Sequence, residues 1–307
     1  MKVLVATEKP FAPAAVEGIK KIIEGAGMEF ALLEKYTSPE ELQTAVADGV
    51  NALIVRSDKV TAEVLAAGPE LRIVVRAGAG YDNVDLEAAK AAGVVVENTP
   101  GQNSNAVAEL VFGLLVMAVR NMYSGTSGSE LLGKRLGIHA FGQVGRNVAR
   151  IAKGFGLEVS ALDPFCPDEV MTAAGVEPVH DLKELYANNK FVSLHIPATP
   201  ETRGSVGYEL VTLLPKGGVL VNTARKEVID EEGLCRALRE RPDLKYVADI
   251  APDCADALRE EFAGRVFFTS KKMGAQTAEA NINAGLAAAR QIVAFFVDGD
   301  TRFQVNK

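Results

Sequence analysis

The chain has 307 residues, of which 48% are apolar and 24% are charged, a composition typical of a globular protein with room for two domains. Acidic residues outnumber basic ones by 40 to 33, and the net charge of −7 argues against nucleic acid or an anionic membrane surface as the main partner. Apolar runs such as 110–119 are too short to span a bilayer, so no membrane partner is expected.

Cysteine and histidine are both scarce, which limits the possible disulfides, zinc sites and histidine-dependent catalytic sites. The three cysteines, Cys166, Cys235 and Cys254, are widely spaced and predict neither a disulfide framework nor a zinc site, so we expect a reducing, cytoplasmic setting. The N-terminus reads as a first strand and not as a signal peptide. His139 is expected in the core and His180 in solvent, and no histidine lies near a metal-ligand pair or a serine elbow.

Short β-branched segments alternate with helical patterns along the chain. Strands are predicted at 3–6, 52–56, 73–75 and 94–96, with helices at 13–25 and 39–48, the latter with Ser38 as its N-cap. A long helix over 105–121 and a flexible loop over 123–129 follow. The later strands are predicted at 136–140, 158–162, 191–196, 219–222, 246–249 and 266–268, before a last helix over 277–297. This alternation predicts an α/β protein with two doubly wound parallel sheets.

A partial dinucleotide fingerprint, Ala140-x-Gly142-x-x-Gly145, stands between a predicted strand and a helix. Alanine replaces the first glycine, which is tolerable if the backbone of Ala140 keeps a negative φ. Asp163 ends the next strand, where a carboxylate accepts hydrogen bonds from an adenosine ribose and repels a 2′-phosphate. The pattern favours NAD over NADP, with a strand-end cap as the alternative role of Asp163.

Beyond this loop, the chain resembles the D-isomer-specific 2-hydroxyacid dehydrogenases, and within them the phosphoglycerate dehydrogenases, nearly from end to end. The resemblance is carried by Arg-Ala-Gly-Ala-Gly at 76–80, Asn-Thr-Pro-Gly-Gln-Asn at 98–103, Ser-Leu-His-Ile-Pro at 193–197, Asn-Thr-Ala-Arg at 222–225 and Gly-Ala-Gln-Thr at 274–277. It implies a discontinuous, flavodoxin-like substrate domain at 1–99 and 283–307, a Rossmann NAD-binding domain at 100–282, and an active site in a cleft between them. It also implies a homodimer through the NAD-binding domain, with the helix after Asn105 in the interface.

The resemblance also assigns roles to single residues. Arg225 would bind the substrate carboxylate, and Asp249 would hold the nicotinamide carboxamide. The substrate is further expected to meet Arg56, Ser57, Gly78 and Asn105. The remaining cofactor contacts are expected from Ala140, Gly142, Gln143, Val144, Gly145, Asp163, His195, Pro197, Thr223, Ala224 and Gly274.

Two departures from the family pattern concern the acid/base group. Lys272 stands where the family usually has a histidine, and Asp253 or Asp256 is the nearest substitute for its usual glutamate partner. A short branch of phosphoglycerate dehydrogenases, without a C-terminal regulatory domain, resembles this chain in having lysine there. Lys272 can act as a base only when neutral, which requires burial or a cationic neighbour to lower its pKa. Lys271 competes for the role, and simple electrostatic binding is the alternative.

The sequence therefore predicts NAD-dependent oxidation of D-3-phosphoglycerate, a small phosphorylated 2-hydroxy acid, with Lys272 and Asp253 as the acid/base pair. Arg56, Arg76, Lys134 and Arg135 are available as cations for the phosphate group. The alternatives are a glyoxylate or hydroxypyruvate reductase on the same scaffold, and a dinucleotide-gated binding protein without catalysis. No metal is expected.

Overall fold

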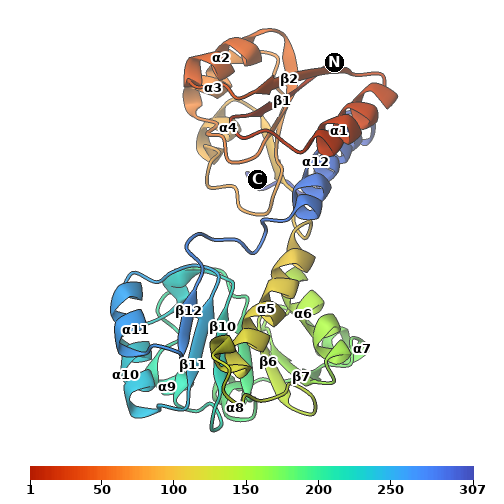
Figure 1. The fold of residues 1–307 in the computed structure, drawn as a ribbon. Helices are drawn as coiled ribbons and strands as arrows, with labels where there is room; N and C mark the ends of the chain where they lie inside the picture. Colours follow the sequence, from red (N-terminus) through yellow and green to blue (C-terminus); the bar gives the residue numbers. More distant parts are fainter. The chain divides into compact units, whose positions relative to one another are not determined.

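The computed structural model describes residues 1–307 and divides them into two compact units (Figure 1). Unit 1 comprises Met1–Asn103 and Gln276–Lys307, and unit 2 comprises Ser104–Ala275. The second boundary lies earlier than the 282/283 expected from the sequence. Helix α12 (Ala278–Asp298) packs along its length with unit 1, so the division precedes it.

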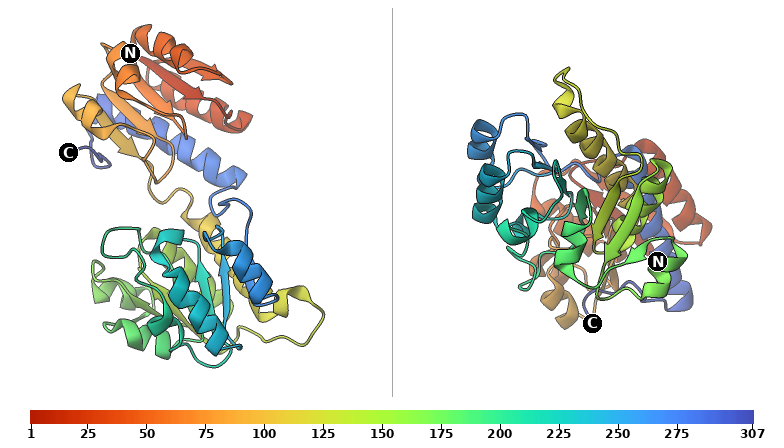
Figure 2. Two further views of the ribbon diagram at one scale, coloured as in Figure 1. Left: turned by 90° about the vertical axis from the view of Figure 1, so that its left-hand side faces the viewer. Right: turned by 90° about the horizontal axis from the view of Figure 1, so that it is seen from below.

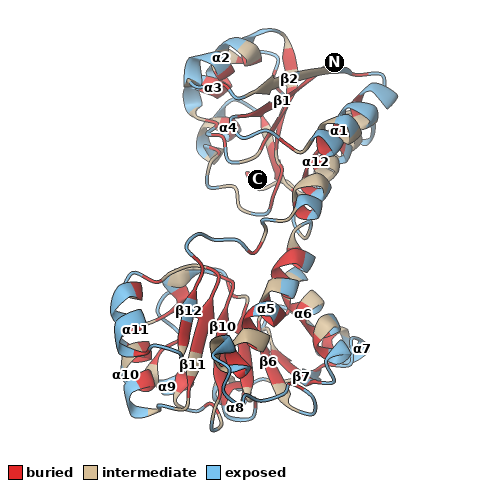
Figure 3. Cartoon of the chain, in the orientation of Figure 1, coloured by how far each residue is buried: buried red, intermediate tan, exposed pale blue.

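Unit 1 is built on a five-stranded parallel sheet in the order β2-β1-β3-β4-β5. The strands are β1 (Lys2–Thr7), β2 (Glu29–Glu34), β3 (Val50–Val55), β4 (Ile73–Arg76) and β5 (Val95–Asn98). The helices are α1 (Pro13–Gly25), α2 (Pro39–Ala47), α3 (Ala62–Ala67), α4 (Leu86–Ala91) and α12. Separate apolar cores on the two faces, one under α1 and α12 and one under α2, α3 and α4, bury the central strands (Figure 3).

Helix α12 lies alongside α1 in both Figure 1 and Figure 2, and it also packs on β3 and β4. By length and composition it is the one helix that could cross a membrane, and the apolar runs considered in the sequence did not include it. The same properties suit its observed place, because Ala284, Ala288 and Ile292 are buried against the sheet. Thr277 caps its first turn, and Gly299, at φ 67°, ends it.

The last residues of the chain extend the sheet of unit 1 at β5. Gln304 pairs with Glu97 as an isolated antiparallel bridge, and the Val305 N–H donates to the Val96 carbonyl at 2.9 Å. The buried Asn306 side chain accepts from the Val96 N–H at 3.0 Å and donates to the Val94 carbonyl at 2.8 Å. The chain therefore returns to unit 1 as part of its structure, which explains why the unit is discontinuous in sequence.

Unit 2 contains a seven-stranded parallel sheet in the order β12-β11-β10-β9-β6-β7-β8. The strands are β6 (Arg135–His139), β7 (Glu158–Leu162), β8 (Glu177–Pro178), β9 (Phe191–Leu194), β10 (Val219–Asn222), β11 (Lys245–Ala248) and β12 (Val266–Phe268). Helices and 3₁₀ turns connect them: α5 (Ser104–Val119), η1 (Asn121–Tyr123), α6 (Gln143–Gly154), α7 (Asp168–Ala173), α8 (Leu182–Ala187), α9 (Tyr208–Val211), η2 (Lys226–Val228), α10 (Glu231–Glu240) and α11 (Ala255–Glu261). The strand order reverses between β6 and β9, which creates the switch point where such sheets bind ligands.

The predicted fold class, two doubly wound parallel α/β sheets, is confirmed. The predicted bounds of β7, β10 and β12 match those observed, and Ser38 forms the N-cap of α2 in a capping box with Glu41. Two edge strands, β2 and β8, were missed. β2 is half-exposed and bounded by Glu29 and Glu34, and β8 has only two residues, so neither shows the apolar run of a buried strand.

Glu97, where the C-terminal segment joins β5, should make the stability of unit 1 depend on pH. Burial raises its carboxyl pKa from 4.5 to about 7, and the Phe303 N–H and Arg302 only partly offset this. The folded state thus holds a proton that the unfolded chain loses, so stability falls as pH rises from about 4.5 towards 7. We expect Glu97→Gln to be more stable than the wild type by about 2 kcal/mol at pH 8 and nearly equal at pH 4.5, measured by urea unfolding. Equal pH dependence of the two proteins would contradict the role given to Glu97.

Candidate active site

The candidate site of unit 2 lies at the carboxyl ends of its parallel strands. The phosphate loop follows β6, Asp163 follows β7, and His195 follows β9. Arg225 comes shortly after β10, and Asp249 directly after β11. Because parallel strands end at the same edge of the sheet, residues far apart in sequence gather around the switch point.

The loop from Ala140 to Gly145 has the shape that a dinucleotide pyrophosphate requires. A Cβ added at Gly142 would meet nothing within 4 Å, so the space over the loop is open. A Cβ at Gly145 would lie 2.4 Å from the Ala140 carbonyl oxygen, so only glycine lets α6 pack this close to the strand. No side chain caps the first turn of α6, which leaves its N–H groups available to an anion.

The expectation that Ala140 keeps a negative φ is wrong. Its φ is 82°, in the left-handed region that alanine adopts at a cost of about 1 kcal/mol or more. The tight turn between β6 and α6 imposes this conformation whichever residue stands there, which is why the fingerprint usually has glycine in this place. The chain thus keeps the loop geometry despite the substitution.

Asp163 ties the end of β7 to the phosphate loop. One carboxylate oxygen accepts from the Phe141 N–H at 2.8 Å and the other from the Phe165 N–H at 2.9 Å. Asp163 therefore acts as a strand-end cap, and because each carboxylate oxygen can accept more than one hydrogen bond, the ribose contact stays a prediction.

Arg225 and Lys272 converge on a single backbone oxygen, that of Ala224. The Arg225 Nη1 donates to it at 3.0 Å and the Lys272 Nζ at 2.5 Å. Burial lowers the pKa of Lys272, and the neighbouring Arg225 lowers it further, while Asp249 and Glu227 oppose the shift. Lys272, and not Lys271, is the lysine with this contact.

The turn that carries this carbonyl is held by Asn222, which the sequence analysis quoted only as part of a motif. Its buried side chain accepts from the Ala224 N–H at 2.9 Å and donates to the Arg225 carbonyl at 3.0 Å. The sequence did contain a signal for this role. An asparagine at the end of a buried strand can form a hydrogen bond with the backbone two residues further on.

Asp249 is fully buried, and one of its carboxylate oxygens has no partner. The other oxygen accepts from the Gly274 N–H at 3.0 Å, and a Cβ at Gly274 would lie 2.8 Å from it. Burial raises the Asp249 pKa, opposed first by Lys272. The Thr223 hydroxyl is also buried without a partner. Such buried groups need an explanation, and an amide-bearing cofactor such as nicotinamide would supply N–H donors to them when bound.

The histidines occupy supporting positions. His195 is half-buried, and burial lowers its pKa to about 3, with His139 adding to the shift, so it stays neutral and contacts the Ser193 hydroxyl at 2.9 Å. His139 is buried against Tyr186, and burial lowers its pKa to about 4, as expected for a core residue. His180 is exposed, as expected, and lies 3.1 Å from Asp168.

Asp253, predicted as the partner of Lys272, is placed elsewhere. Its exposed carboxylate pairs with Lys226. Asp256, the other substitute, pairs with Arg259 at 3.0 Å. The loop after β11 is held to the start of α10, where Glu231 accepts the Asp253 N–H at 2.8 Å. The carboxylates that act on Lys272 are Asp249 and Glu227.

The other predicted cofactor contacts lie on exposed or half-buried backbone. Gln143 and Val144 open α6, and the Pro197 carbonyl accepts from Thr202 at 2.5 Å. Asn105 of α5 falls in unit 2, where it donates to Glu109 at 2.7 Å and accepts from Arg150 at 2.6 Å.

Unit 1 holds a second cationic group, Arg56 and Arg76, at the ends of β3 and β4. The Arg76 Nε donates to the Arg56 carbonyl at 2.9 Å, and the Arg56 guanidinium contacts Asn281 of α12 at 2.6 Å. Burial lowers the pKa of both arginines, and Arg56 lowers that of Arg76 further. Nearby negative charge balances these two positive charges only in part, which suits binding of an anionic ligand.

The loop around this pair depends on Asp58, which the sequence analysis missed. Its buried carboxylate accepts from the Arg56 N–H at 3.1 Å, the Glu8 N–H at 2.7 Å and Tyr36 at 2.9 Å. Ser57 is exposed beside it. The Gly78 N–H, predicted to bind substrate, donates to the Arg76 carbonyl at 2.8 Å.

Comparison with known proteins agrees with this geometry. A solved structure, the NAD⁺-bound 3-phosphoglycerate dehydrogenase of Entamoeba histolytica, is 48% identical, with a TM-score of 0.85 over 100% of this chain and 99% of that one. The hydroxypyruvate reductase of Thermotoga maritima is 34% identical over 86% of this chain and 90% of its own length. The chain belongs to the D-isomer-specific 2-hydroxyacid dehydrogenase family.

Within this D-isomer-specific 2-hydroxyacid dehydrogenase, residues 116–257 match the domain described as "D-isomer specific 2-hydroxyacid dehydrogenase, NAD binding domain", so unit 2 carries an NAD-binding domain. The D-3-phosphoglycerate dehydrogenase of Methanocaldococcus jannaschii is 37% identical over 82% of this chain but only 51% of its own. The chain thus spans about half the length of that relative.

The strained alanine gives a test of the loop. We expect Ala140→Gly to raise the free energy of unfolding by about 1 kcal/mol, because glycine adopts φ 82° without the Cβ penalty. Gly145→Ala should lower it by about 2 kcal/mol or more, because its Cβ would collide with the Ala140 carbonyl. Urea unfolding measures both, and a less stable Ala140→Gly would show that the Ala140 methyl group contributes more by packing than its strain costs.

Proposed function

We propose that this family member oxidises D-3-phosphoglycerate to 3-phosphohydroxypyruvate, the first step of serine biosynthesis, with NAD in preference to NADP. The convergence of Arg225 and Lys272 on the Ala224 carbonyl, beside the buried Asp249, carries the proposal. This arrangement places the permanently charged guanidinium of Arg225 beside the amine of Lys272, which can bind or release a proton, at the edge of an NAD-binding domain. NAD supplies the acceptor for the hydride from C2.

Arg225 would bind the substrate carboxylate. Only its Nη1 is engaged, by the Ala224 oxygen, so the rest of the guanidinium has N–H donors free for a bidentate contact. Arginine keeps its charge at every working pH, so binding of the carboxylate does not compete with proton transfer.

Lys272 would take the proton of the C2 hydroxyl during oxidation and return it during reduction. Its pKa lies below the ordinary value, chiefly through burial and then through Arg225, so the neutral amine is accessible at a lower pH than for a free lysine. Asp249 limits this shift, and it thereby keeps the ammonium available for the reductive direction.

A phosphorylated substrate is supported by the cations of unit 1. Arg56 and Arg76 are partly buried and repel one another, so a phosphate dianion would relieve both the desolvation and the repulsion. The phosphoglycerate dehydrogenases among the relatives point to the same substrate class.

A hydroxypyruvate reductase is the second candidate, favoured by the relative of that name whose length the chain nearly covers. A non-catalytic binding protein is less well supported, because it would need no lysine with a lowered pKa beside Arg225. A homodimer through the NAD-binding domain and a cytoplasmic setting stay predictions.

The substrate is tested by following NADH or NADPH oxidation with 3-phosphohydroxypyruvate, hydroxypyruvate, glyoxylate and pyruvate at equal concentrations. We expect kcat/KM to be at least about tenfold higher for the phosphorylated acid and for NADH, since a bidentate phosphate contact contributes more than 1.4 kcal/mol. Equal or faster turnover of hydroxypyruvate or glyoxylate would select the reductase instead. If none of the acids were turned over although NADH still bound, a non-catalytic binding protein would be the remaining interpretation.

The role of Lys272 is tested by Lys272→Arg, which keeps the positive charge but cannot release its proton near neutral pH. We expect kcat for oxidation to fall by about a hundredfold or more, with NADH binding unchanged by fluorescence titration. The wild-type rate should rise with pH as the amine of Lys272 becomes neutral.

Lys271→Arg is the matched control, and it should keep near wild-type activity at every pH. If Lys272→Arg kept more than about a tenth of the wild-type rate, the residue would act by charge alone.

A further inference from the structure

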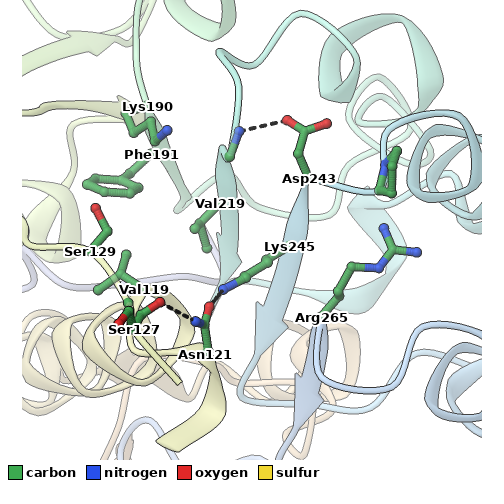
Figure 4. A pocket seen from close by; sticks show the side chains of 13 residues that line it. Val119, Asn121, Ser127, Ser129, Lys190, Phe191, Val219, Asp243, Lys245 and Arg265 are labelled. Carbon is green, nitrogen blue, oxygen red and sulfur yellow. Dashed lines mark hydrogen bonds between the residues drawn. The ribbon is translucent and has the colours of Figure 1, made fainter. Parts of the chain in front are cut away.

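A cavity of about 370 Å³ opens at the other edge of the seven-stranded sheet, where the strands begin (Figure 4). Phe191, Val219 and Lys245 are the first residues of β9, β10 and β11, and Arg265 precedes β12. The segment after α5 closes one side through Asn121 and Ser129. All of these residues belong to unit 2, and none belongs to the candidate active site at the carboxyl edge.

Three cations line this cavity, namely Lys190, Lys245 and Arg265, and each contacts only neutral acceptors. Lys245 donates to the Ala118 carbonyl at 2.7 Å and to the Asn121 side chain at 2.6 Å. Arg265 donates through Nη1 to the Leu238 carbonyl at 2.8 Å, and Lys190 donates to the Lys216 carbonyl. Carbonyls orient these side chains but cancel none of their charge.

The one carboxylate in the lining, Asp243, is already engaged. Arg241 holds it through two contacts, at 2.9 and 2.8 Å, and the Gly217 N–H donates to it at 2.7 Å. These contacts hold the pKa of Asp243 well below its usual range. Lys190, Lys245 and Arg265 therefore make no ion pair of their own, and Asp243 and Glu261 act on them only from a distance.

The surroundings increase this imbalance. Burial lowers the pKa of Lys190, Lys245 and Arg265, and Lys134 and Lys216 lower that of Lys190 further, while Asp243 opposes the shift of Lys190 and Asp243 and Glu261 oppose that of Arg265. Partly buried cations in proteins are normally paired with carboxylates, yet these three make no ion pair in a chain of net charge −7.

We propose that this cavity is a binding site for a small multivalent anion, bound through its phosphate or carboxylate groups. The volume suits a small metabolite and not a macromolecular segment. Donors remain for it: Lys245 has a third N–H, and the Nε and Nη2 groups of Arg265 donate no hydrogen bond to the protein, which leaves a planar fork for an oxyanion.

The test is calorimetric titration of the full chain with inorganic pyrophosphate and with citrate, at saturating NADH so that the loop after β6 is filled. We expect the wild type to bind at least one of the two anions with a submillimolar Kd. Tighter binding of pyrophosphate would identify a phosphate site, and tighter binding of citrate a carboxylate site. Lys190→Gln should weaken binding about tenfold, and Lys190→Arg, which keeps the charge, should bind nearly as the wild type does.

Lys153→Gln is the matched control, because Lys153 also donates to a carbonyl, that of Ala174, at a distance in sequence and structure from the cavity. No binding by the wild type up to about 10 mM, or an equal loss in Lys153→Gln, would overturn the proposal. If Lys190→Gln does not fold, Lys245→Met provides the same comparison.

Discussion

The carbonyl oxygen of Ala224 is the contact on which the candidate active site depends. It receives the Arg225 guanidinium and the Lys272 ammonium, which come from strand ends 47 positions apart in the chain. Without this acceptor, the two like charges would have no shared group to hold them together. The carbonyl is fixed in turn by Asn222, whose side chain bonds the backbone on both sides of it. The positions of Arg225 and Lys272 thus depend on the side-chain amide of Asn222 at the end of β10.

Two like charges on one oxygen create a site that favours anions. Burial and then this repulsion lower the pKa of Lys272, and Asp249 and Glu227 offset the shift only in part. A substrate carboxylate at Arg225 would replace the missing negative charge. Binding would then raise the pKa of Lys272 again, so the free and the occupied enzyme hold the lysine proton with different strength.

Much of this could be predicted from the sequence, because it depends on local patterns. Alternating strands and helices predict a parallel sheet, which brings its strand ends together. Arg225, Asp249 and Lys272 were selected through the resemblance to the family, and the parallel sheet explains why they lie at one edge. Side-chain direction in loops could not be predicted. Asp253 was selected because it lies close to β11 in the sequence. In the structure its N–H donates to Glu231 of α10, and its carboxylate forms an ion pair with Lys226. The prediction of a negative φ at Ala140 was wrong for a related reason, because the turn and not the residue type determines φ there.

The cations at the amino edge of the sheet in unit 2 are of two kinds, one paired with a carboxylate and the others without an ion pair. At the amino edge, Arg241 is held by Asp243 and by the Thr212 and Leu214 carbonyls, so all of its charge serves the fold. Lys190, Lys245 and Arg265 lie beside it and make no ion pair, and their side chains donate to carbonyl oxygens. Removing a cation from water without pairing it costs stability. In this cavity the missing counter-charge would therefore come from a bound anion.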